Sequence, residues 1–494
     1  MTEMEPVVSI APLLAVGVAA AAGLAVLALG RHPNLREGCS LLAGAVQFAL
    51  VMTMAPVVWD GGVVAYRVVD LLPGVAIVFR VDGLGLLFGG VASFLWMVTT
   101  VYSMGYMRSL QEHAQTRYFS CFALSLSAAL GVAFSGNLFT LFLFYEVLTF
   151  VTYPLVIHHE TEEAFEGGRK YMVYLLGTSK TFLLVALLLT YLVAGTLEIK
   201  PGGMFPADAD PVWVTVIFVL FIAGLTKAAI MPLHNWLPTA MIAPTPVSAL
   251  LHAVAVVKVG VFSVARVMVD VFGVDLLERL HVGIPTAAFV SVTILGASVI
   301  ALSQDNLKLR LAYSTVSQLS YVILGAALLT PGGLVGSVMQ IAAHAFGKIT
   351  LFFCAGAIYV ASHKTKVSEM SGLARRMPWT MAAFTVGALS LIGAPPLAGF
   401  ASKWWLAVGS IEAQQPALLF VLLSSTMLNA AYFLPIIYKA YFEAPAASAG
   451  AKPSAERQEA PWTMVVPLSL TAVGTVMLGL YSEPFLALAR QVIR

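Results

Sequence analysis

Runs of about twenty apolar residues follow one another along the whole chain, and this feature limits the fold more than any other. A helix of about 20 apolar residues can cross the hydrocarbon core of a bilayer. Only 11% of the 494 residues are charged, whereas roughly 25% is usual in soluble domains. We therefore predict an all-α integral membrane protein with about 14 transmembrane helices. The candidate spans lie near 7–30, 38–57, 83–105, 118–134, 137–158, 168–195, 212–232, 240–270, 282–303, 309–329, 333–361, 379–401, 416–442 and 462–487.

The composition also excludes several classes of function. The net charge is +2 and the sequence has no basic tract, so we expect no nucleic-acid partner. Cys39, Cys121 and Cys354 lie far apart, within or beside apolar runs, which argues against a disulfide framework or a thiolate metal site. The sequence shows no flavin, nucleotide or iron–sulfur motif, so we expect no cofactor and no bound metal.

The charges between the spans predict the orientation of the chain. An even number of spans places both termini on one side of the membrane. Lysine and arginine are about twice as frequent in the odd-numbered connections as elsewhere between the spans, and positive charge accumulates in cytoplasmic loops. The first run follows Glu3 and Glu5 and lacks the basic start of a signal peptide, so we expect it to be retained. We predict a multi-pass protein of a prokaryotic cell membrane with both termini outside.

Three connections have a composition of their own. Residues 58–81 alternate apolar and polar side chains in part, and we expect a short external hairpin there. Residues 444–461 combine small residues, prolines and mixed charges, as is typical of a flexible linker. His158, His159 and the acidic run 160–166 are interpreted as a solvated loop.

Several charged or titratable residues fall within the apolar runs or at their margins. A charged side chain at the bilayer centre costs roughly 2.5–3.5 kcal/mol, so these groups must face the protein interior, one another or water. Acidic and basic groups that alternate along a buried path are the form a proton relay takes. The residues are Glu146, Lys170, Lys180, Lys227, His252, Lys258, His344, Lys348 and Lys403.

Each of these groups also has a purely structural interpretation. Glu146 could belong to a structural ion pair, and His344 could pack between helices without titrating. Lys170 could extend its ammonium group to the membrane interface. Lys180 lies in the middle of a run that has no proline or glycine break beside it. We place Glu146, Lys227, His252, Lys258, His344, Lys348 and Lys403 on the predicted proton pathway, with Lys170 and Lys180 as possible partners.

Proline and glycine interrupt two of the apolar runs close to a lysine. Pro232 follows Lys227 by about one helical turn, and a Gly/Pro-rich sequence precedes Lys403. Broken helices beside buried charges are typical of transport sites. Segments 225–238 and 395–405 each combine a proline break, a lysine and tryptophan. This similarity indicates two repeats around a site near the membrane midplane.

The spacing of the buried bases gives further expectations. His344 and Lys348 are four residues apart and share a helical face, and a histidine titrates near neutral pH. His252 and Lys258 are six residues apart, so they do not share a face unless the helix is locally unwound.

From about residue 80 to residue 440, the sequence resembles the antiporter-like subunits of complex I, Mrp-type cation/proton antiporters and membrane-bound hydrogenases. The resemblance implies a core of two inverted five-helix repeats with discontinuous helices. We accordingly divide the chain into residues 1–117 (three spans and a hairpin), 118–270 (first repeat), 282–442 (second repeat) and 443–494 (linker and last span). The matching motifs are NWLPTA (235–240), APTPVSALLHAVAVVKVG (243–260), QDNLKLRLAYSTVSQ (304–318), HAFGK (344–348) and GAPPLAGFASK (393–403).

The resemblance also implies roles for single residues. The glutamate of the family's fifth helix falls on Glu146, and the lysines of its seventh and eighth helices fall on Lys227 and Lys258. Its twelfth-helix position, a glutamate in some members, is Lys403 here, which favours a branch like the D-type subunit of Mrp antiporters. Lys180 has no counterpart in the family pattern; it could pair with Glu146 or with nothing. The family's histidines of the eighth and eleventh helices correspond to His252 and His344.

Two hypotheses of function follow from the resemblance. The first is a proton-translocating subunit of a multi-subunit Mrp-type Na⁺(K⁺)/H⁺ antiporter. The second is a proton-pumping membrane subunit of a redox-driven complex, such as an NADH-quinone oxidoreductase, a membrane-bound hydrogenase or a formate-linked assembly. A structural anchor for a soluble partner is a third class, which the buried charges disfavour. Both leading hypotheses imply membrane subunits as partners. Because the chain ends soon after the last predicted span, we do not expect the largest antiporter-like subunit of complex I.

Overall fold

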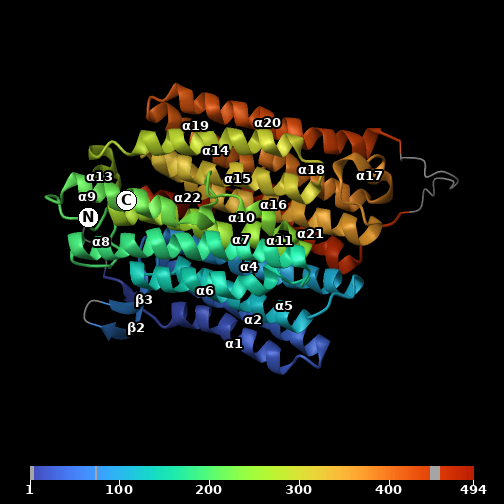
Figure 1. Cartoon of the computed structure of the whole chain (residues 1–494), viewed down its shortest axis with the longest axis horizontal. Coiled ribbons are helices and arrows are strands. Elements are labelled where there is room, and N and C mark those ends of the chain that lie inside the picture. Colours follow the sequence, from blue (N-terminus) through green and yellow to red (C-terminus); the bar gives the residue numbers. More distant parts are fainter. Residues whose placement is uncertain (1–4, 73–74, 445–456, 494) are drawn as a thin grey trace.

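Long apolar helices that run roughly side by side make up most of the molecule (Figure 1). The computed structural model describes residues 5–72, 75–444 and 457–493, and 77% of the structure is helical. Within these ranges, 11 helices are long and apolar enough to cross a membrane. They are α1 (Ala11–Ala28), α2 (Pro33–Thr53), α4 (Gly83–Ser109), α5 (Gln115–Ala133), α6 (Leu138–Val156), α7–η1–α8 (Glu162–Ala194), α11–η4–α12–η5 (Thr245–Phe272), α14 (Gly283–Ser303), α16 (Pro331–Ser362), α20 (Pro416–Phe442) and α21 (Trp462–Leu480).

The other three predicted spans correspond to helices that are shorter or more polar. They are α9 (Pro211–Gly224), α15 (Leu307–Ala327) and α18 (Pro378–Ile392). The class predicted from the sequence, a helical integral membrane protein, is confirmed. Short helices lie in the connections: α3 (Ala55–Trp59), α13 (Val274–Arg279), η6 (Val367–Glu369), α17 (Leu373–Arg376), α22 (Glu483–Arg490) and η7 (Gln491–Ile493).

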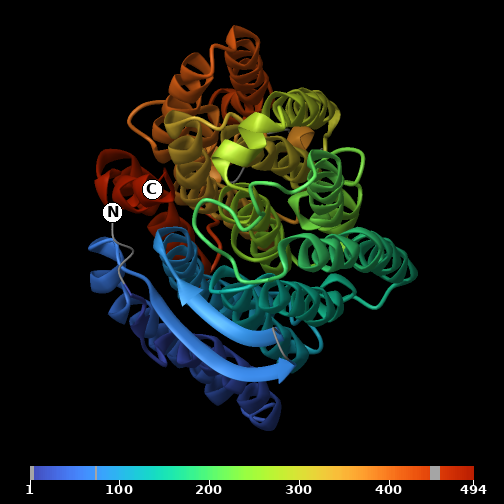
Figure 2. The same ribbon diagram turned by 90° about the vertical axis from the view of Figure 1, so that its left-hand side faces the viewer.

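A small sheet covers one end of the helices (Figure 2). Strands β2 (Val64–Leu72) and β3 (Val75–Val81) form the antiparallel hairpin that the alternating sequence predicts. The sequence did not predict β1 (Val7–Val8), which pairs in parallel with β2 and occupies the beginning of the first predicted span. The fold is therefore α-helical except for this sheet, and α1 begins only at Ala11.

Both ends of the described chain lie at the hairpin end of the bundle. The backbone nitrogen of Val7 donates a hydrogen bond to the carbonyl of Val63 at 2.8 Å. Near the other terminus, Gln491 Nε2 donates to the carbonyl of Val58 at 2.7 Å. Residues 445–456 of the predicted linker lie outside the described residues.

Two apolar helices are interrupted at the places that the sequence predicts. Helix α9 ends at Gly224 and is followed by η2 (Thr226–Ala228), an irregular segment, α10 (Trp236–Thr239) and η3 (Ala240–Ile242). Helix α18 ends at Ile392, and α19 (Ala398–Glu412) continues after a short break. The predicted span 379–401 is therefore two helices in the structure. The second helix, α19, extends beyond the predicted end and contains Lys403.

The two most buried spans form the centre of the bundle. The membrane-length windows of α11–η4–α12–η5 and of α16 are completely buried, and they carry His252, Lys258, His344 and Lys348. The first of these spans packs tightly against the broken helix, because a Cβ added at Gly260 would lie 2.2 Å from the carbonyl carbon of Lys227.

One arginine, Arg266, lies within the central span. It is 4% exposed within α12. Its guanidinium group pairs with Asp82, the N-cap residue of α4, and with Asp270 of η5 at 2.7 Å. This ion cluster ties the start of α4 to the central span, and arginine can remain in the interior because both partners are anionic.

Candidate functional site

Lys227 lies at the interruption after α9 and is completely buried. Its ammonium group donates to the backbone carbonyl of Tyr145 at 2.8 Å and to Thr149 Oγ1 at 2.7 Å. It also lies 3.3 Å from the centre of the Tyr145 ring. The backbone nitrogen of Lys227, freed by the break in the helix, donates to the Tyr145 hydroxyl at 3.1 Å. Helix α6 therefore supplies the hydrogen-bond acceptors that hold this lysine.

Glu146, also on α6, pairs with Lys180 rather than with Lys227. The distance from Lys180 Nζ to Glu146 Oε2 is 2.6 Å, the carboxylate is buried, and the lysine side chain is half exposed. Lys180 lies in the π-helical turn η1 (Ser179–Leu183), the only irregularity in its otherwise unbroken helical segment (Glu162–Ala194). The sequence left open whether Lys180 pairs with Glu146 or with nothing, and the structure shows the pair with Glu146.

His252 and Lys258 lie on either side of an irregularity in the central span. His252 belongs to the π-helical turn η4 (Leu250–Val254), and Ala255 then departs from helical geometry. The helix is therefore locally unwound between the two residues, as a shared face would require. Lys258 Nζ donates to the carbonyl of Ile341 on α16 at 2.9 Å, and in the described part of the chain neither ring nitrogen of His252 has a hydrogen-bond partner.

His344 and Lys348 lie on one uninterrupted helix, α16. Both side chains are buried. Lys348 Nζ donates to the carbonyl of Leu311 at 3.2 Å and to the hydroxyl of Ser314, both on α15. The ring nitrogens of His344 have no partner among the residues that the structure describes.

Lys403 reaches back from α19 to the end of the preceding helical piece. Its ammonium group donates to the carbonyls of Leu391 and Ile392 at 3.0 and 2.8 Å, and to Thr426 Oγ1 at 3.2 Å. The carbonyls at the last turn of a helix lack intrahelical partners and carry partial negative charge. The lysine therefore satisfies the carboxyl end of α18.

A network of buried polar side chains reaches Lys403, and its members were not among the predicted site residues. Gln340 Nε2 donates to Gln318 Oε1 at 2.8 Å, and Ser402 Oγ donates to Gln340 Oε1 at 2.6 Å. With its amide oriented to satisfy its neighbours, the Asn429 oxygen lies 2.7 Å from Gln318 Nε2 and 3.2 Å from Lys403 Nζ. The signal that identified the lysines, polar residues inside apolar runs, would also have found these amides.

Lys170 remains apart from these contacts. It is exposed on α7, and no ion pair to it occurs within the described ranges. Between the two possible partners that the sequence indicated, the structure joins only Lys180 to the candidate site.

Three of these lysines are thus buried, and the fourth, Lys403, is partly buried. In the part of the chain that the structure describes, Lys227, Lys258, Lys348 and Lys403 have no carboxylate oxygen within 4.0 Å, and each donates to at least one backbone carbonyl. An ammonium group buried without a counter-ion releases its proton more readily than one in water. Such groups can alternate between charged and neutral forms, so the arrangement suits proton exchange.

The fold and this row of lysines define a multi-pass membrane protein with titratable groups buried along its interior. The chain belongs to the family described as "NADH:quinone oxidoreductase/Mrp antiporter, TM", which matches residues 135–429.

Relatives in this family are subunits of different kinds of membrane complex. NADH-quinone oxidoreductase subunit N of Desulforudis audaxviator is 33% identical over 80% of each chain. The A/B subunit of a probable K(+)/H(+) antiporter of Rhizobium meliloti is 32% identical over 90% of this chain, which spans 44% of that relative's length.

Solved structures similar to this chain also come from both an Mrp complex and a respiratory complex. The Mrp complex from Dietzia sp. DQ12-45-1b contains a chain that superposes with a TM-score of 0.87 at 26% identity, covering 98% of this chain and 96% of that one. A chain of the archaeal membrane-bound sulfane sulfur reductase, a respiratory complex, gives 0.86 at 25% identity, covering 98% and 97%. The predicted family resemblance is confirmed.

Proposed function

We propose that the chain is the proton-translocating subunit of a multi-subunit Mrp-type Na⁺(K⁺)/H⁺ antiporter in a prokaryotic cell membrane. The observation that carries this proposal is the set of three buried lysines and one partly buried lysine, which have no counter-ion among the described residues. The similarity to one chain of the Mrp complex over nearly the whole length supports it. Other membrane subunits would be its partners, as they are in the assemblies formed by its relatives.

The proposed route for the proton passes from Lys227 through His252, Lys258, His344 and Lys348 to Lys403, bridged by water. Lys258 donates to α16, the helix that carries His344 and Lys348, so the two central spans are coupled at one point of the row. The Glu146–Lys180 pair adjoins the start of the route, because Glu146 directly follows Tyr145, whose carbonyl receives Lys227. A change in charge at Lys227 would be felt by this pair.

The proposed division of the chain is two inverted repeats, residues 118–270 and 282–442, with both termini outside. The support comes from the two interrupted helices, since a lysine lies at or just after each break. Both ends of the chain lie at the hairpin end, in agreement with an even number of spans.

The alternative is a proton-pumping subunit of a redox-driven complex. It is supported by the match to a respiratory complex and by the 33% identity to one subunit of a quinone oxidoreductase. The same row of lysines would serve either function, because the proton path is separate from the source of energy.

One reconstitution separates the two functions. The purified complex that contains this chain is placed in liposomes with an internal pH dye and no electron donor, and a Na⁺ or K⁺ gradient is imposed. We expect the cation gradient alone to move protons. Proton movement that occurs only with an electron donor and acceptor would favour the redox complex and contradict the antiporter.

A further inference from the structure

Two connections at the end of the bundle opposite the hairpin bring histidines around one carboxylate. Glu112 and His113 follow α4, whereas His158 and His159 lie between α6 and α7. His158 Nε2 and His159 Nδ1 each lie 3.7 Å from Glu112 Oε2. The ring centres of His113 and His158 are 4.8 Å apart. Residues from distant parts of the sequence therefore converge on one point.

His158 is completely buried, although the sequence analysis placed it in a solvated loop. That prediction is wrong for His158 because its ring packs edge-on against Tyr118, and Arg117 donates to its backbone carbonyl at 3.0 Å. In the described ranges neither of its ring nitrogens has a hydrogen-bond partner. A buried polar group without a partner costs about 1–3 kcal/mol, so a ligand for this ring would stabilise the protein.

We propose that Glu112, His113 and His158 form a binding site for a divalent transition-metal ion of the zinc class. One ligand atom from each residue lies within 4.8 Å of the other two. Zinc binds histidine nitrogen and carboxylate oxygen at about 2.0–2.2 Å, so the three atoms must approach to about 3.3 Å of one another. Side-chain rotations in the two connections would have to bring these atoms together, and His159 Nδ1 lies nearby, 3.7 Å from Glu112 Oε2.

The donor set and its surroundings favour such an ion over the hard cations. Imidazole nitrogens select transition metals, whereas Ca²⁺ and Mg²⁺ require oxygen ligands. The charge of Arg117 is offset by its ion pair with Glu160.

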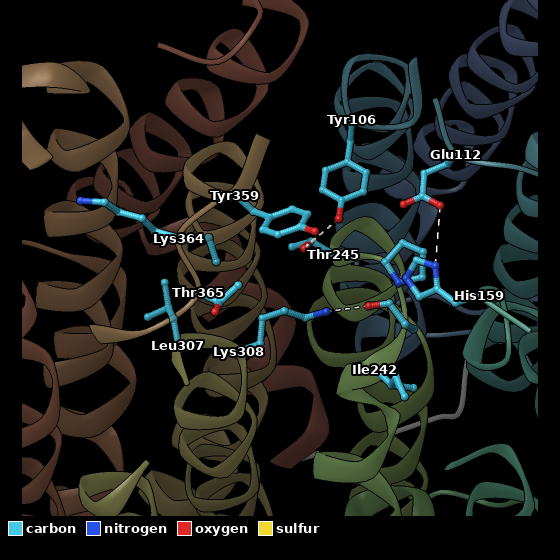
Figure 3. Close-up of a pocket in the computed structure, with 13 residues that line it drawn as sticks. Tyr106, Glu112, His159, Ile242, Thr245, Leu307, Lys308, Tyr359, Lys364 and Thr365 are labelled. Carbon is cyan, nitrogen blue, oxygen red and sulfur yellow. Dashed lines mark hydrogen bonds and ion pairs between the residues drawn. The ribbon is translucent and has the colours of Figure 1, made fainter. Parts of the chain in front are cut away.

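The site is also reachable from outside the protein. Figure 3 shows Glu112 and His159 facing each other beside a cavity of about 220 Å³, which Lys308 and Thr245 also line. His113 is exposed. An ion could therefore bind without unfolding of either connection.

Binding is measured directly, so the result is independent of the proposed transport function. The full chain, in its complex, without a histidine tag and freed of metal, is titrated with Co²⁺ by visible absorption and with Zn²⁺ against a chromophoric chelator. We expect one equivalent to bind with the visible absorption of a four-coordinate nitrogen–oxygen site. His113→Ala and His158→Gln should each lose that equivalent or bind it at least about tenfold more weakly.

Controls separate loss of a ligand from loss of the fold. His113 is exposed, so its replacement leaves the core packing intact. His158→Cys retains a metal ligand and should retain the ion, whereas His281→Gln, at the opposite end of the bundle, should bind like the unaltered protein. Undiminished binding in His113→Ala and His158→Gln, or no stoichiometric binding in the unaltered protein, would overturn the site.

Discussion

The two halves of the molecule hold their interrupted-helix lysines differently. In the first half, Lys227 is held by Tyr145 and Thr149 of α6, next to the ion pair of Glu146 and Lys180. In the second half, Lys403 is held by the carbonyls at the end of α18 and by neutral amide and hydroxyl groups.

Both ammonium groups are held by a backbone carbonyl and a hydroxyl group, and the difference is that an ion pair adjoins the lysine of the first half. A nearby carboxylate strongly stabilises a positive charge, and this stabilisation is lost only when the carboxylate itself becomes neutral. Backbone carbonyls at the end of a helix give a smaller and fixed stabilisation. We infer that the first half responds to charge moving along the row, while the second half passes the proton on.

The largest effect is expected from the groups on which this comparison rests. Lys227→Ala and Glu146→Ala should each reduce coupled transport to background while the complex still assembles. Removing Glu146 deletes the negative charge that adjoins Lys227, and removing Lys227 deletes a member of the row. Cation-driven pH changes in vesicles measure the effect, with subunit content as the assembly control. Full antiport in either variant would refute the role given to the first half.

The next test concerns Lys258, which links the halves by its contact with α16. Lys258→Arg preserves the positive charge, but a guanidinium group does not release its proton in a protein. We expect the arginine variant to be nearly as inactive as Lys258→Ala in the same vesicle assay. Restored transport would mean that Lys258 provides only fixed charge.

A smaller effect is expected from the amides of the second half. Gln318→Leu removes one hydrogen-bond partner from each of Gln340 and Asn429, at a cost of about 1–3 kcal/mol, so transport should fall by about tenfold and the melting temperature should decrease. Gln47 is the matched control, because it is buried on α2 and donates to the carbonyl of Ala15 at 2.8 Å, away from the lysines. Gln47→Leu should lower the melting temperature alone. Equal transport in the two variants would contradict a role for the network.

The smallest effect is expected at the half-exposed lysine of the first half. Exposed ion pairs contribute about 0–1 kcal/mol, so Lys180→Ala should slow transport by about fivefold or less. Lys170→Ala, a change of the same kind at an exposed lysine of the same helical segment, should leave the rate unchanged. If both variants behave alike, the pairing of Lys180 with Glu146 has no part in transport.

Much of this fold could be predicted, because its main constraint is local. Runs of apolar residues show where helices cross the membrane, and the prolines near Lys227 and Lys403 mark the interruptions. The hairpin was predictable from its alternation. The pairing of β1 with β2 was not, since two residues carry too little pattern to indicate a strand.

The candidate site was predictable in its members but not in its contacts. A lysine in an apolar run is conspicuous, whereas its partner can lie anywhere in the chain. Lys258 finds its acceptor on α16, 83 residues away, and the turn η4 beside it has no signature in the sequence. His158 shows the opposite failure, because a polar loop sequence gave no sign that this ring is buried.

We infer that this chain transports protons and that a partner subunit transports Na⁺ or K⁺. Glu37 and Glu146 are the buried carboxylates in the described part of the chain, and both form ion pairs with arginine or lysine. A dehydrated Na⁺ needs several oxygen ligands, and these two groups are already paired.

The most direct test is to reconstitute the chain without its partners and to follow an internal pH dye and radioactive Na⁺ uptake in the same vesicles. We expect proton flux that Lys403→Ala abolishes, with Na⁺ uptake no greater than in empty vesicles. Specific Na⁺ uptake that disappears in Lys403→Ala would contradict this inference.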